Sequence, residues 1–92
     1  MELDNKKNTM LFTVPEKQSE MSNIMRDVYK ALKEKGYDPL CQLVGYVMSG
    51  DPTYITSHNN ARSMITRLER DEIIEELFAF YIEEHLEKEI KD

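Results

Sequence analysis

The chain carries few of the residue types from which metal sites and catalytic centres are built. Its 92 residues include one cysteine and two histidines, at Cys41, His58 and His85. These side chains are far apart in the sequence, and they cannot complete a tetrahedral zinc site without carboxylates. The three glycines form neither of the common glycine-rich phosphate-binding motifs. The sequence therefore predicts no metal, no cofactor and no enzymatic activity, with Cys41 as a small core residue.

Paired carboxylates near the end of the chain could serve acid–base chemistry, but no pocket-forming motif surrounds Glu75–Glu76 or Glu83–Glu84. Residues 70–92 hold nine acidic and three basic residues, so the formal net charge of −6 arises there. This pattern favours a solvated helix face, with an acidic surface for a basic partner as the alternative. The negative charge also argues against nucleic-acid binding, which requires a basic surface.

A basic group lies before this acidic segment and comprises His58, Arg62, Arg67 and Arg70. His58, Arg62 and Arg70 are separated by four and eight residues, so on one helix they would share a side. Arginine is suited to bidentate contacts with carboxylates and phosphates. The group is therefore a candidate docking site for a partner protein or a phosphothreonine. Pairing with Glu69 or Asp71 is the alternative.

The elements that must position these residues are predicted to be helices. Residues 1–18 show no helical period and are expected to form a flexible arm, whereas residues 19–92 are expected to form a helical domain. Helices are predicted at 19–35, capped by Ser19 or Ser22 and ended by Gly36, and at 40–48, 57–70 and 72–90. Asp38–Pro39 and Asp51–Pro52 each carry the signal for the start of a helical segment. The expected fold is all-α, a small compact bundle of four to five helices. The segment 40–48, apolar over most of its circumference, is expected to be the most buried.

The last predicted helix has more apolar surface than one core contact requires. At about 100° per residue, its apolar side chains cover an arc of about 200°, roughly twice the usual stripe. We therefore expect a homodimer with an interface that includes Leu77, Phe78, Tyr81 and Ile82. A central helix surrounded within the monomer is the alternative. No run of about 18 apolar residues exists, so no membrane insertion is expected, and the lone cysteine suggests a cytoplasmic protein.

Several runs of residues resemble the IreB family, also known as UPF0297, in order and spacing. They are Val28–Tyr37, Gln42–Tyr46, Ser49–Ile55, His58–Arg62 and Leu68–Glu72. The resemblance covers roughly residues 23–82. Thr9–Phe12 also looks like the family's threonine-x-x-phenylalanine element.

This resemblance implies a cytosolic, all-helical and dimeric regulatory phosphoprotein. Family members are described as substrates of transmembrane Ser/Thr kinases with extracellular PASTA repeats. They restrain peptidoglycan precursor synthesis, partly by promoting Clp-protease turnover of the pathway's first committed enzyme. Thr9 is then the expected phosphoacceptor and Thr13 the runner-up. The alternative function is a constitutive helical interaction module with no phosphorylation switch.

A phosphate on Thr9 would have one of two effects on the arm. It could pair with Arg62 or Arg70 and cover the basic group, or the acidic last helix could repel it. Charge counts favour the first effect, in which phosphorylation weakens partner binding at Arg62 and Arg70.

Overall fold

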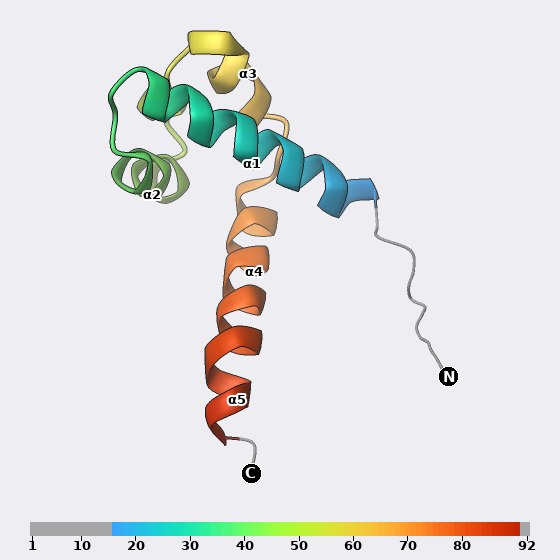
Figure 1. The fold of residues 1–92 in the computed structure, drawn as a ribbon. Helices are drawn as coiled ribbons and strands as arrows, with labels where there is room; N and C mark the ends of the chain where they lie inside the picture. Colours follow the sequence, from blue (N-terminus) through green and yellow to red (C-terminus); the bar gives the residue numbers. More distant parts are fainter. Residues whose placement is uncertain (1–15, 91–92) are drawn as a thin grey trace.

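The computed structural model describes residues 16–90, and these residues form helices joined by short links (Figure 1). The α-helices are α1 (Glu16–Glu34), α2 (Pro39–Ser49), α3 (Ala61–Ile65), α4 (Arg70–Tyr81) and α5 (Glu87–Ile90). Two 3₁₀ turns (Pro52–Tyr54 and His58–Asn60) precede α3, and a π-helical turn (Ile82–Leu86) joins α4 to α5. The described residues contain no strand, which confirms the all-α prediction for this part of the chain.

The first helix begins earlier than expected and ends with a defined motif. It starts at Glu16, directly after Pro15, so Ser19 and Ser22 lie inside the helix and do not cap it. At its end Gly36 adopts a left-handed φ of 83°. The Gly36 N–H donates to the Lys33 carbonyl at 3.0 Å, and the Tyr37 N–H donates to the Leu32 carbonyl at 2.9 Å. This pair of bonds is a Schellman motif, which satisfies carbonyls that the helix leaves free.

The aspartate–proline pairs act as helix starts, as expected. Asp38 accepts a hydrogen bond from the Leu40 N–H at 3.1 Å, and Pro39 occupies the first position of α2. Asp51 repeats this arrangement and accepts from the Thr53 N–H at 3.0 Å. Both carboxylates satisfy N–H groups that a helix cannot pair internally.

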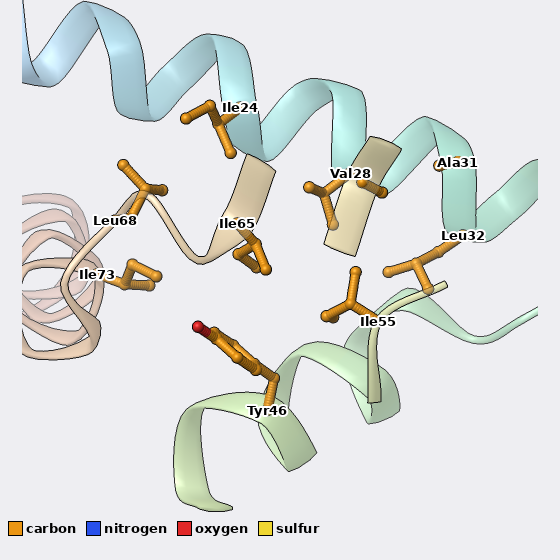
Figure 2. Close-up of a cluster of buried hydrophobic side chains, with 10 residues drawn as sticks. Ile24, Val28, Ala31, Leu32, Tyr46, Ile55, Ile65, Leu68 and Ile73 are labelled. Carbon is orange, nitrogen blue, oxygen red and sulfur yellow. The ribbon is translucent and has the colours of Figure 1, made fainter. Parts of the chain in front are cut away.

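The core lies where α1 crosses α3 and one side of α2 (Figure 2). Ile24, Val28 and Leu32 recur every four residues on one face of α1 and are buried. Figure 2 shows these side chains pointing toward Ile65 and toward Ile55, which lies in the link after α2. The other core residues are Ala31, Tyr46, Ala61, Leu68 and Ile73.

The prediction that α2 would be the most buried element is wrong. Its one buried residue is Tyr46, and Cys41 is exposed rather than in the core. Leu40, Val44 and Met48 are 71%, 51% and 78% exposed. Their spacing of four residues places them on one face of the helix, and the body packs against a different face. Helix α2 therefore has two apolar faces. One packs against the body of the monomer, and the other is exposed.

The single helix expected over residues 57–70 is also interrupted. Asn59 and Asn60 have left-handed φ values of 53° and 66°, which a right-handed helix cannot contain. Asparagine tolerates this conformation better than most residues. The reversal leaves a five-residue α3 that packs against α1 through Ala61 and Ile65.

Helix α4 extends away from this body and continues through the π-helical turn into α5 (Figure 1). Ile73 is the buried residue of α4. The principal extents of 45 × 28 × 22 Å reflect this projecting helix.

Candidate interaction surfaces

The basic group expected on one helix is divided among three elements. His58 lies in a 3₁₀ turn, Arg62 in α3 and Arg70 at the start of α4, while Arg67 lies in the link between α3 and α4. The prediction that His58, Arg62 and Arg70 share one side of a helix is therefore wrong. The left-handed residue Asn60 separates the first two, and the extended backbone of Glu69 precedes the third.

Arg62 holds the link that follows α2. Its Nε donates to the Ile55 carbonyl at 2.8 Å, and the side chain is half-buried. The Asp51 carboxylate accepts from the Thr53 hydroxyl at 2.7 Å. This bond, the Thr53 N–H and the positive charge of Arg62 hold the pKa of Asp51 below its ordinary value.

Arg70 caps the end of α2. Its Nη1 donates to the Val47 carbonyl at 2.8 Å, although the two residues belong to different helices. The guanidinium lies against Gly50, where an added Cβ would come within 2.8 Å of Arg70 Cζ. A cation near the last carbonyls of a helix is favoured because those groups carry partial negative charge.

His58 joins the 3₁₀ turn to the end of α1. Its Nε2 lies 2.8 Å from Oε1 of Glu34, and the Asn59 side-chain amide donates to the same oxygen at 3.5 Å. Arg67 is exposed. The arginines at positions 62 and 70 each use one of five N–H donors in these bonds, so other donors remain for a partner.

An apolar groove separates α2 from α4. It has a volume of about 370 Å³ and exposes no polar surface. Leu40, Val44 and Met48 of α2 form one wall, and α4 forms the other with Ile74, Leu77 and Phe78. Buried and half-buried core residues complete the lining, namely Met25, Leu43, Val47, Ile65 and Ile73. A groove of this kind accepts an apolar helix face rather than a charged ligand.

The four residues expected at a dimer interface are exposed on the projecting helix. Leu77, Phe78, Tyr81 and Ile82 are 56%, 62%, 53% and 40% exposed. The alternative prediction, a central helix surrounded within the monomer, is therefore wrong for the described region, because its other helices do not surround α4. The Tyr81 ring stacks at a tilt on His85, with ring centroids 4.7 Å apart. Sequence reasoning missed the α2 wall, although segment 40–48 is apolar over most of its circumference, which indicates that more than one face needs covering.

Other candidate chemistry finds little support in the part of the chain that the structure describes. No group of three or more potential metal ligands occurs there. The Cys41 thiol donates to the Asp38 carboxylate at 3.3 Å, and this bond and the Asp38 charge raise the pKa of Cys41. A raised pKa keeps the thiol protonated and less nucleophilic. None of the described helices is long and apolar enough to cross a membrane. Thr9 and Thr13 lie outside the described residues.

The chain resembles known proteins over most of its length. The profile of the IreB regulatory phosphoprotein family matches residues 7–83. A UPF0297 protein of Ruminiclostridium cellulolyticum is 58% identical over 78 residues, which cover 84% of this chain and 89% of that protein. A UPF0297 protein of Lachnoclostridium phytofermentans is 57% identical over 83 residues, with 88% and 93% covered. The corresponding protein of Acetivibrio thermocellus is 56% identical over 82 residues, with 88% and 91% covered.

Proposed function

The chain belongs to the IreB family of regulatory phosphoproteins, and we propose that it is a dimeric, non-enzymatic regulator switched by phosphorylation of Thr9. One observation carries this proposal. The family match begins at residue 7, so it includes Thr9 and Thr13 as well as the helical body. The phosphoacceptor threonine and the surfaces that respond to its phosphorylation would then lie on the same chain.

The modifying enzyme in this proposal is a cytoplasm-facing Ser/Thr kinase with extracellular PASTA repeats. Thr9 precedes Met10–Phe12, an apolar run that can anchor an extended peptide beside a kinase active site. The controlled process is peptidoglycan precursor synthesis, through contacts with protein partners in the cytoplasm. A constitutive interaction module without a phosphorylation switch is the alternative function.

Intact-mass measurement after incubation with such a kinase and ATP tests the switch. The wild-type chain should gain the mass of one phosphoryl group, Thr9→Ala should gain none, and Thr13→Ala should behave as the wild type. Equal phosphorylation of Thr9→Ala and wild type would mean that Thr9 is not the phosphoacceptor. No labelling of any variant, while a control substrate is modified, would favour the constitutive module.

The proposed dimer uses the groove between α2 and α4. Large contiguous apolar surfaces mark interaction sites, and here several exposed apolar side chains of α2 and α4 face one groove. The groove and the apolar face of the projecting helix lie on the same chain, so a twofold arrangement can bury both at once. The proposed interface therefore joins Leu77, Phe78, Tyr81 and Ile82 to the α2 wall formed by Leu40, Val44 and Met48.

Sedimentation of a matched pair of variants tests this assembly. Phe78 lines the groove, whereas Phe80 is equally exposed on α4 and does not line it. Phe78→Glu should give monomers at tens of micromolar, because it would bury an unpaired carboxylate. Phe80→Glu should retain the wild-type mass. A monomeric wild type at that concentration would contradict the dimer.

The proposed partner surface is the basic group of His58, Arg62, Arg67 and Arg70. Arg67 and Arg70 are its exposed members, and the unused donors of Arg62 and Arg70 can bind a carboxylate or phosphate on the partner. Arg67→Ala should weaken partner binding, whereas Arg26→Ala on α1 should not.

In this proposal phosphorylated Thr9 competes for the same group, so phosphorylation should weaken partner binding. Equal affinity for both forms of the chain would rule out that competition.

A further inference from the structure

The two walls of the groove are connected by the side chain of Arg70. Arg70 begins α4, and its Nη1 donates to the carbonyl of Val47, whose side chain lines the groove. Ile73 and Ile74 follow one turn later on the same side of α4 and also line the groove. The hydrogen bond therefore lies immediately beside the groove and spans from one wall to the other.

The end of α2 is shaped to accept this guanidinium. Gly50 follows the helix with a left-handed φ of 76°, and its N–H donates to the Tyr46 carbonyl at 2.7 Å. The Val47 carbonyl belongs to the last turn, which has no further helical N–H to pair with. A side chain at position 50 would displace the Arg70 guanidinium, since a Cβ there would lie 2.9 Å from Nη2. Glycine therefore provides both the turn and the space for Arg70.

Helix α4 contributes one buried side chain to the core. Ile73 is its buried residue, and Leu68 in the preceding link is the nearest other core side chain. Phe78 lies five residues beyond Ile73, which is about 7.5 Å along the helix axis. A small rotation of α4 about Ile73 would therefore move Phe78 considerably relative to α2. The bond from Arg70 to Val47 opposes that rotation.

We propose that Arg70 is a positioning residue that sets the angle between α2 and α4 and thereby the width of the apolar groove. The claim that a second copy of the chain occupies the groove rests on the proposed function. The role of Arg70 in setting the angle does not depend on it. Arg70 then contributes to self-association from behind the interface, by holding the two walls at the separation that the incoming helix requires.

The angle can be measured directly with spin labels on α2 and α4. Cys41 is exposed, is the one cysteine of the chain and does not line the groove, so it provides the label site on α2. Glu75→Cys provides the site on α4, and an excess of unlabelled protein suppresses distances between copies. With Arg70 in place the distance distribution should be narrow. Arg70→Gln should broaden or shift it, and Arg70→Lys should broaden it less, since the ammonium keeps the charge but not the planar fork.

Arg26→Gln is the matched control, because it removes the same group from an exposed position on α1. Its labelled distance should equal that of the wild type. All variants are compared below their melting temperatures and with helical content checked by circular dichroism, so that loss of folding is not mistaken for a change of angle.

Self-association provides the second readout. Arg70→Gln should weaken the dimer about tenfold, in line with loss of a charge-assisted hydrogen bond. Gly50→Ala should weaken it in the wild-type background, both by displacing Arg70 and by straining the left-handed turn. The first of these effects is lost in an Arg70→Gln background, so the two changes should be less than additive. Full additivity of the two changes would contradict a shared mechanism.

The outcomes separate the positioning role from the proposed dimer. A weaker dimer with an unchanged distance between the two spin labels would mean that Arg70 touches the second copy directly, which overturns the positioning role. An unchanged distance and an unchanged dimer would overturn it too. A monomeric wild type with a label distance that depends on Arg70 would contradict the dimer and support the positioning role.

Discussion

The α1 side of the molecule and the α2–α4 side use the same apolar patterning with opposite results. On α1, Ile24, Val28 and Leu32 recur at helical spacing and are buried against α3 and the link after α2. On α2, Leu40, Val44 and Met48 recur at the same kind of spacing and remain exposed. An apolar stripe therefore indicates that a face will be covered, but not whether its own chain or another chain covers it.

The largest difference in stability between these two regions should appear when one leucine of each region is replaced by alanine. Leu32→Ala should lower the free energy of unfolding by about 2–5 kcal/mol, because it leaves a cavity in the core. Leu40→Ala should change it by less than about 0.5 kcal/mol in a Phe78→Glu background, which is monomeric in our proposal. Urea denaturation measures both values. Comparable losses at the two positions would mean that α2 is covered within the monomer.

A smaller effect should follow removal of the Arg62 side chain, which joins the two regions through the Ile55 carbonyl. Arg62→Ala should lower the free energy of unfolding by about 1–3 kcal/mol, since a carbonyl beside the core loses its charged donor. Arg67→Ala, which removes an exposed arginine nearby, should cost much less. If Arg62→Ala and Arg67→Ala both had the melting temperature of the wild type, the bond from Arg62 to the Ile55 carbonyl would not contribute to stability.

The smallest effect concerns Asp51, at the boundary between α2 and the link. Its pKa is lowered in the folded state, first by the Thr53 hydroxyl, then by the Thr53 N–H, and also by Arg62. A depressed folded pKa stabilises the fold above the unfolded pKa of about 3.9, and this contribution is lost as the pH falls through the lower folded value.

Asp51→Asn should therefore melt below the wild type at neutral pH and approach it in acid. Thermal melts of both proteins as a function of pH measure this difference, which should be modest because the carboxylate is exposed. A constant difference at every pH would mean that the Asp51 charge does not contribute.

Local chemistry was readable from the residues themselves. The aspartate–proline pairs at 38–39 and 51–52 start helical segments, and Gly36 ends α1, because each interaction involves residues within one turn. The family resemblance was readable for the same reason, since it depends on residue order alone, and the match over residues 7–83 confirms it.

The break at Asn59–Asn60 was not readable, because asparagine only permits a left-handed backbone. The packing of Ala61 and Ile65 beneath α1 is compatible with that choice, and such packing outweighs local helix propensity. The basic group was expected along one helix for this reason, and the interruption distributes it over three elements.

By itself the sequence determined that the body is helical, where capping residues begin and end several of its segments, and that the last helix has an apolar face wider than one core requires. Only the tertiary structure decided that α2 exposes an apolar face, that this face and α4 line one groove, and that Arg62 and Arg70 donate to the backbone of distant segments. The physical reason is range. Caps and helical periodicity act within a few residues, whereas a groove and a guanidinium–carbonyl contact depend on how separate helices pack, which no local pattern encodes.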